Sequence, residues 1–238
     1  MSIIRNNITS MQVLASWLQA NAVPEYFASI AIDANNQIIT CKDANNNTLM
    51  EYNINAKTFS IYKSSDNAET FNIAKSNYEC AEPNSDVPTI AAKCSGGIMI
   101  LISNINEGSA KGWYLLNIII TKTNNNKTAI IAGTYYYENT TIDTGTRIIA
   151  NGIASKSGVH AAAWGDETSE TRTISFNSSA QNQTQFVSFT TYAQPDSTSY
   201  TPNAFYMPVG EFYTTIYGKF ESHGAMYITN GYWAIKDA

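Results

Sequence analysis

Two similar turn sequences constrain the fold of this chain more than any other feature. Residues 33–37 read Asp-Ala-Asn-Asn-Gln, and residues 43–47, ten positions later, read Asp-Ala-Asn-Asn-Asn. Asp and Asn side chains hydrogen-bond their own backbone and tolerate left-handed conformations, so both segments predict tight turns. Short β-prone stretches flank these turns, at 29–33, 38–42, 48–53 and 58–62. This alternation predicts a series of hairpins.

The composition extends this prediction to the whole chain. Charged residues make up 14% of the sequence, against about 25% in typical globular domains. Asn, Thr and Tyr take their place, and these residues favour turns and strands. Hydrophobic residues reach 44% over 238 residues, enough to bury a sizeable core. We therefore expect a mainly β chain, with antiparallel sandwich or barrel-like domains.

One segment near the N-terminus has helical periodicity. Its apolar residues recur at three- and four-residue spacing, which predicts a short α-helix over 9–22 that ends before Pro24. The apolar face of this helix must be covered, either by the chain's own sheet or by a neighbouring subunit. The second alternative makes four residues a candidate assembly interface: Met11, Leu14, Trp17 and Leu18.

The middle of the chain holds the most continuous apolar segments. They predict strands that are covered on both faces, at 98–102, 113–121 and 128–137. The polar stretch before them predicts a linker or a long loop at 64–95. The expected organisation has three parts: helix and hairpins for docking at 1–63, the linker at 64–95, and a main β domain at 96–238.

The C-terminal part is rich in aromatic residues and predicts further strands, among them 171–177, 185–192 and 225–229. Tyr and Trp combine a large apolar area with a polar group, which suits protein interfaces and sugar stacking. Core filling and cross-strand pairing are the more usual roles of such residues in a β chain. The candidate ligand or partner surface consists of Tyr206, Tyr213, Tyr217, Tyr232 and Trp233.

Charge and hydropathy argue against two classes of partner. The chain has 14 basic and 19 acidic residues, a net charge of −5, and no cluster of Lys or Arg, so we expect no nucleic-acid binding. The longest apolar stretches, 97–102 and 114–120, are too short to span a bilayer. The first residues do not resemble a secretion signal. We expect synthesis in a cytoplasm without membrane insertion.

A calcium loop is the most specific metal motif to test. Asp43, Asn45 and Asn47 occupy the first ligand positions of an EF-hand pattern. Thr48 stands where the pattern requires Gly, and Ile54 where it requires the bidentate Glu. A plain hairpin turn is therefore expected, and neither a metal nor a cofactor is predicted.

Catalytic constellations are not recognisable in the sequence. His160 and His223 lie near no G-x-S-x-G elbow, and no pair stands out among the later carboxylates Asp166, Glu167, Glu170, Asp196, Glu211 and Glu221. The cysteines form no close pair and predict free, buried thiols: Cys41, Cys80 and Cys94. We therefore expect a protein that is not an enzyme.

Three segments resemble virion proteins of tailed phages and prophages of gut Firmicutes. They are IITCKDANNNTL at 38–49, IIITKTN at 118–124 and YITNGYWAIKD at 227–237. The resemblance touches the two ends and the middle of the chain and carries over no functional residue. It implies a structural component of a particle, present in several copies at the head surface or in the tail.

These observations lead to one expected function and two alternatives. We expect a non-enzymatic virion structural protein, a head-surface decoration or tail component, that acts in particle assembly. Its partners would be other virion proteins and further copies of itself, with a trimer preferred, and it would reside in the virion. The alternatives are a receptor- or carbohydrate-binding tail module that recognises a host-surface glycan, and a glycan-degrading enzyme.

Overall fold

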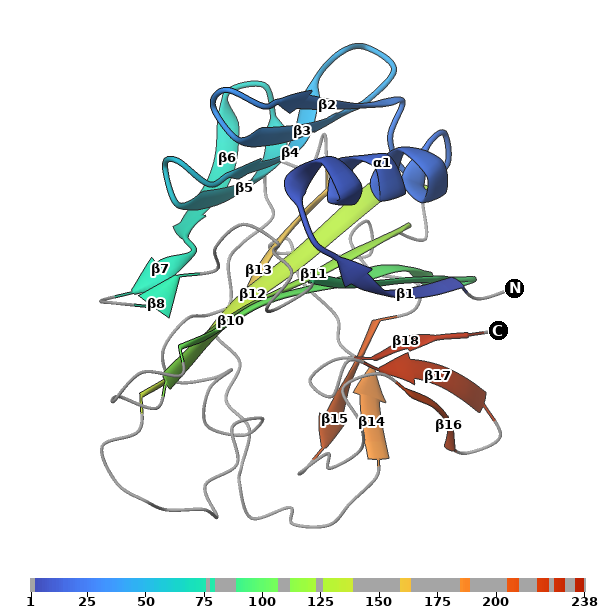
Figure 1. The fold of residues 1–238 in the computed structure, drawn as a ribbon. Coiled ribbons are helices and arrows are strands. Elements are labelled where there is room, and N and C mark those ends of the chain that lie inside the picture. Colours follow the sequence, from blue (N-terminus) through green and yellow to red (C-terminus); the bar gives the residue numbers. More distant parts are fainter. Residues whose placement is uncertain are drawn as a thin grey trace.

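The chain folds into antiparallel sheets with one short α-helix near its N-terminus (Figure 1). The computed structural model describes residues 3–75, 78–79, 89–106, 112–122, 126–138, 159–163, 185–188, 205–209, 218–222, 225–229 and 234–237. The prediction of a mainly β, sandwich-like chain with a short N-terminal helix is confirmed. The sheets are open and do not close into a barrel.

The helix α1 spans Met11–Ala22, within the predicted segment. Ser10 is its N-cap, and the Ser10 hydroxyl accepts the backbone N–H of Val13 at 3.2 Å. This bond satisfies one of the N–H groups that the first helical turn leaves without a partner. The helix ends at Val23, in extended conformation, because the ring of Pro24 disfavours a helical residue before it.

The hairpins form a five-stranded meander in chain order. Its strands are β2 (Ser29–Asp33), β3 (Ile38–Lys42), β4 (Thr48–Asn53), β5 (Thr58–Ser64) and β6 (Asn67–Asn72). The first three predicted strands are confirmed with these bounds, and the fourth continues to Ser64. Every neighbouring pair is antiparallel.

Three turns of this meander are built in the same way, at a spacing of ten residues. In each, a side-chain oxygen of the first residue accepts one or two backbone N–H groups from residues two to four positions later. These first residues are Asp33, Asp43 and Asn53. Each turn also contains one left-handed residue, with φ between 51° and 65°: Gln37, Asn46 and Lys57. The side chain thus supplies a hydrogen-bond acceptor for backbone N–H groups in the turn that no neighbouring strand can bond.

A six-stranded sheet lies against the helix and the meander. Its strands, in spatial order, are β1 (Ile3–Ile8), β9 (Thr89–Cys94), β10 (Gly97–Asn106), β11 (Gly112–Lys122), β12 (Thr128–Glu138) and β13 (Val159–Ala163). The apolar runs predicted at 98–102, 113–121 and 128–137 form its long strands.

Both faces of this sheet are buried, as the continuous apolar runs predict. Successive residues of a strand point to opposite faces. Ile98, Ile100 and Ile102 belong to the core that contains α1 and the meander. Met99 and Leu101, which lie between them, are also buried, at 0% and 3% exposure. Figure 1 shows the C-terminal sheet on the side of β10–β12 that faces away from α1.

The C-terminal sheet is five-stranded, and a separate short hairpin lies beside β10 and β11. In spatial order the strands are β14 (Gln185–Ser188), β15 (Phe205–Val209), β18 (Ala234–Lys236), β17 (Ala225–Thr229) and β16 (Gly218–Ser222). The short hairpin consists of β7 (Ala74–Lys75) and β8 (Tyr78–Glu79). The predicted strand at 225–229 is confirmed, whereas the one at 171–177 lies outside the described residues.

Six strands of the described structure were not expected from the sequence: β1, β6, β7, β8, β9 and β13. Four of them, β6 to β9, lie in the stretch 64–95 that the sequence suggested as a linker or loop. β9 pairs with both β1 and β10, so the first residues share a sheet with the apolar centre of the chain. The boundaries of the sheets therefore do not coincide with the expected division at 63 and 95.

Gly97 allows β9 to turn directly into β10. Its φ of +148° is rare for any residue with a side chain. A Cβ atom at this position would collide with the carbonyl oxygen of Ile120 on β11. The glycine thus permits a tight reversal directly beside a neighbouring strand.

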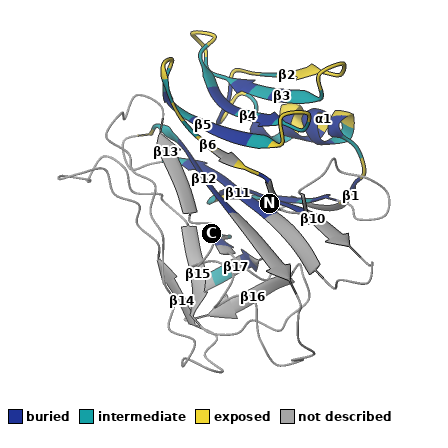
Figure 2. Cartoon of the chain, turned by 90° about the vertical axis from the view of Figure 1, so that its left-hand side faces the viewer, coloured by how far each residue is buried: buried dark blue, intermediate teal, exposed yellow. Residues whose placement is uncertain are grey.

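The main core lies where the helix, the meander and the six-stranded sheet meet. It includes Leu14 and Leu18 of α1, Phe59 of β5, and Ile100 and Ile118 of the central strands. Figure 2 shows the buried residues of α1 and β3–β5 on the side that faces the six-stranded sheet. β2 and the turns of the meander are exposed. Burial of this kind is the dominant favourable contribution to folding.

We predict that Leu14→Ala lowers the free energy of unfolding by about 2–5 kcal/mol, because it removes a fully buried side chain and leaves a cavity. Urea denaturation followed by circular dichroism measures the change. Gln12→Ala, at an exposed position of the same helix, should shift stability by less than about 0.5 kcal/mol. Equal effects of the two variants would contradict the central position of α1.

Candidate functional site

The proposed interface residues of the helix are all covered by the chain itself. Met11, Leu14, Trp17 and Leu18 are exposed by 1%, 2%, 4% and 1%. They pack in the main core with residues of the meander and the six-stranded sheet. The apolar face of α1 is therefore covered by the chain's own sheets and not by a neighbouring subunit. These four side chains therefore offer no surface to a partner in the folded chain.

The predicted aromatic surface mostly falls outside the described residues. Tyr206 lies in β15, where the structure describes only the backbone. Tyr213, Tyr217, Tyr232 and Trp233 are outside the described residues. The role of these aromatic residues stays a prediction.

The turn that begins at Asp43 is a hairpin turn stabilised by its own side chains. One oxygen of the Asp43 carboxylate accepts the backbone N–H groups of Asn45 and Asn47, at 2.9 and 2.8 Å. The other accepts the side-chain amide of Asn47 at 2.9 Å. Both carboxylate oxygens therefore hold the turn together. Across the described residues, His, Cys, Asp and Glu side chains form no group of three or more that could hold a metal.

Two of the three cysteines are described, and both are buried in the interior. Cys41 lies in β3 and Cys94 at the end of β9. Burial raises the pKa of the Cys41 thiol far above its ordinary value, which suppresses the reactive thiolate. Cys80 lies outside the described residues. These two cysteines act as small apolar residues of the core, as predicted.

An exposed edge of the meander is the first surface that could receive a partner. β2 is the outer strand, and four of its five residues are exposed. Ile32 in this strand, 37% exposed, is the one large hydrophobic side chain that is exposed among the described residues. The side-chain oxygen of Gln19 on α1 accepts the N–H of Ile30 at 3.3 Å. This N–H therefore points away from β3, and Gln19 of α1 occupies the outer edge of β2 at this residue.

A cavity at the C-terminal end of α1 is the second surface. Its volume is about 380 Å³ and it opens to solvent. Three segments line it: the chain after the helix, the turn at Asp43, and the end of β11 with the start of β12. The lining residues are Pro24, Glu25, Tyr26, Phe27, Ala28, Asp43, Ala44, Leu49, Lys122, Asn126, Lys127 and Thr128.

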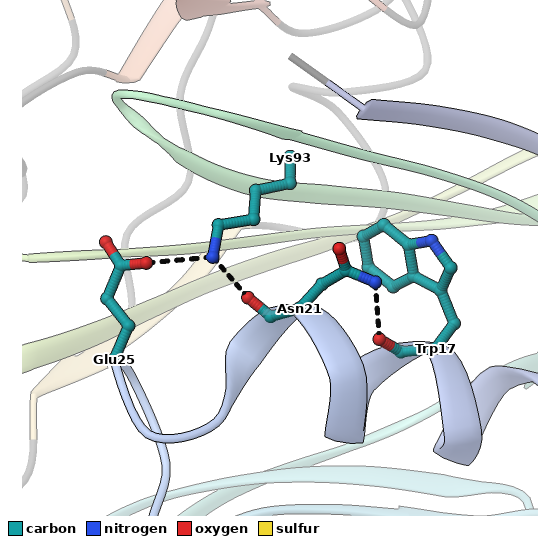
Figure 3. A network of polar contacts seen from close by, with 4 residues as sticks. All are labelled: Trp17, Asn21, Glu25 and Lys93. Atoms are coloured by element: carbon teal, nitrogen blue, oxygen red, sulfur yellow. Dashed lines mark hydrogen bonds and ion pairs between the residues drawn. The ribbon is translucent and has the colours of Figure 1, made fainter. Parts of the chain in front are cut away.

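One wall of this cavity is fixed by a contact between the helix end and the six-stranded sheet (Figure 3). The Lys93 ammonium group of β9 forms an ion pair with Glu25 at 2.9 Å and donates to the backbone carbonyl of Asn21 at 2.6 Å. The Asn21 side chain in turn donates to the carbonyl of Trp17 at 2.8 Å. The last turn of α1 contains no basic residue of its own. Lys93 thus supplies the positive charge that a helix C-terminus favours.

The charges around Glu25 shift the ionisation of two neighbouring groups. Burial by itself would raise the pKa of Glu25, but hydrogen bonds from Lys93 and Tyr26 and the charges of Lys93 and Lys122 lower it. Burial and the negative charge of Glu25 raise the pKa of Tyr26 far above its ordinary value. Glu25 is therefore ionised and Tyr26 neutral at neutral pH.

Lys122 stands opposite Tyr26 across the same corner. Its ammonium group donates to the Thr128 hydroxyl at 3.0 Å and lies 5.6 Å from the centre of the Tyr26 ring. The Thr128 hydroxyl donates onward to the Tyr26 carbonyl at 2.8 Å. Burial lowers the pKa of Lys122, although the charge of Glu25 opposes this shift. The sequence indicated neither Lys122 nor Lys93, because single lysines in strands carry no motif.

Comparison with protein-family models, curated proteins and solved structures found no match to this chain. Within the described residues, α1 is also too short to cross a bilayer. The function must therefore be argued from the sequence and from the two surfaces described above.

We predict that Glu25→Gln lowers the free energy of unfolding at pH 7 by less than about 1 kcal/mol, because this ion pair is half exposed. The folded-state pKa of Glu25 lies below its ordinary value of 4.5. The stabilising effect should be fully present above pH 4.5 and disappear as the pH falls through the lowered pKa. Urea denaturation of both proteins at several pH values measures it.

Glu51→Gln is the control for this experiment, since Glu51 lies on β4 outside the Lys93 contact. It removes a carboxylate without breaking this ion pair. A difference between wild type and Glu25→Gln that grew as the pH fell would contradict the assigned role of Glu25.

Proposed function

We propose that this chain is a non-enzymatic structural protein of a phage virion and that it acts in particle assembly through the edge strand β2. The observation that carries the proposal is the exposed edge with Ile32. Further copies of the chain are the first partners we propose, together with other virion proteins. The resemblance of segments 38–49, 118–124 and 227–237 to virion proteins supports the location in a particle.

Gln19 already bonds the outward N–H of Ile30, so the part of β2 that another strand could pair with is the end at Ile32. The N–H of Ile30 points outward, to Gln19, and residues two positions apart in a strand share their direction. The N–H of Ile32 therefore also points away from β3. An added strand would hydrogen-bond this edge and cover the exposed Ile32 side chain.

The sequence of β2 lacks the features that usually keep an edge strand from pairing. Such edges commonly carry Lys or Pro, or a bulge that twists them away. β2 reads Ser-Ile-Ala-Ile-Asp, and its pairing with β3 runs without a register shift. The carboxylate of Asp33, its one charged group, hydrogen-bonds within the following turn. These properties suit a strand that pairs with a neighbouring subunit.

The same turn-built hairpins suit a particle component. Each turn of the meander is held by its own Asp or Asn side chain, so the loops need no partner to keep their shape. A subunit of this kind can present a preformed edge, and a preformed surface loses less conformational entropy on association. In a particle with many copies, many such contacts would act together, so each could be weak while the assembly remains stable.

Oligomer mass tests the assembly surface. We expect the purified chain to form an oligomer in light scattering, and Ile32→Lys to shift it toward monomer, because a buried lysine at a paired edge is costly. Asn45→Lys adds the same charge at an exposed turn of the same sheet and should leave the mass unchanged. A monomeric wild type, or an oligomer that both variants leave intact, would contradict the role of β2. The mass also tests the trimer preferred from the sequence.

Particle composition tests the location independently. Phage particles purified from the bacterium that carries the gene should contain this chain in several copies, as measured by quantitative mass spectrometry. Cryo-electron microscopy would then assign it to the head surface or the tail. Its absence from particles whose other structural proteins are detected would contradict the virion proposal.

A further inference from the structure

Lys122 presents a half-buried positive charge to the cavity at the end of α1. An ammonium group has three N–H donors, and the hydrogen bond to Thr128 uses one of them. The group also faces the Tyr26 ring, whose centre lies 5.6 Å from the nitrogen. Among the described residues, no carboxylate forms an ion pair with Lys122.

The acidic groups of the same cavity are already engaged. Glu25 pairs with Lys93 and accepts a hydrogen bond from Tyr26. Both oxygens of Asp43 hold their own turn. The negative charges in the wall are thus satisfied by the protein, whereas Lys122 has no ion pair of its own among the described residues.

We propose that this cavity binds the carboxylate of a small organic anion about as large as a single sugar. A carboxylate can accept hydrogen bonds from the N–H groups of Lys122 that do not bond Thr128, and it neutralises the charge of the ammonium group. The volume of about 380 Å³ lies within the range of small-ligand pockets, about 300–1,000 Å³. Pro24, Ala28 and Ala44 add an apolar rim against which the rest of the molecule can pack.

The position of the cavity favours a single negative charge over a phosphate dianion. Residues 24–28 follow the C-terminus of α1, where the helix dipole is negative. Phosphate sites usually rely on helix N-termini, Arg forks or clustered cations. The wall here has two lysines, Lys122 and Lys127, but also two carboxylates, Glu25 and Asp43, so cations are not in excess. A carboxylate monoanion matches this arrangement better.

This inference goes beyond the proposed assembly function, which requires no small ligand. The ligand could be an acidic sugar of a surface polymer or a free carboxylic acid, and both present the same group to Lys122. The cavity and the β2 edge share no described residue, since Ala28 precedes the strand. Failure of one proposal therefore leaves the other untouched.

A titration with D-glucuronate, followed by 15N–1H NMR at pH 7 in low-salt buffer, tests the site. We expect saturable shifts with a Kd of about 1 mM or weaker, centred on residues that line the cavity. Lys122→Gln should weaken binding about tenfold. Lys57→Gln removes a lysine that does not line the cavity and should bind like wild type. D-glucose, which lacks the carboxylate, should not bind.

Each remaining outcome decides the proposal. Glucuronate without saturable shifts, equal binding by Lys122→Gln, or equal binding of glucose would overturn it. These wild-type comparisons with glucose hold even if the Lys122 variant does not fold. Acetate separates the two sources of the carboxylate: weaker binding than glucuronate supports a sugar-sized ligand, and equal binding overturns that part of the proposal.

Discussion

The burial of α1 between the meander and the six-stranded sheet is the contact on which the rest of the described fold depends. A helix of 12 residues is marginal in water by itself. The helix is stabilised because Leu14 and Leu18 on its apolar face pack in one core with strands of both sheets. Lys93 then fixes the end of the helix by binding the Asn21 carbonyl and Glu25. Together these contacts set the course of the chain that follows the helix.

Both candidate surfaces take their position from this helix. On one side, Gln19 holds the N–H of Ile30 and so keeps β2 next to α1 at the edge of the meander. On the other, the residues after Ala22 form the wall of the cavity, facing Lys122. The helix therefore acts as an internal support for surfaces formed by its neighbours. Its own apolar residues are too well buried to act as a docking face.

Local sequence patterns predicted the meander well and the six-stranded sheet only in part. The strands at 29–33 and 38–42 were predictable because Asp33 and Asp43 determine their turns through hydrogen bonds two to four residues away. β1 and β9 were missed because polar residues interrupt their apolar pattern. Their strand structure depends on pairing with each other and with β10, which no local window contains.

The sequence by itself determined the fold class, the helix and the turns, because these follow from hydrogen bonds and periodicities within a few residues. Tertiary structure alone decided which polar groups meet. Lys93 reaches a helix carbonyl 72 residues before it, and Thr128 reaches Tyr26 across 102 residues. It also decided that the apolar face of α1 is covered from within and that β2 is left at an edge. Such choices depend on how whole sheets pack, and a sequence read locally does not contain that information.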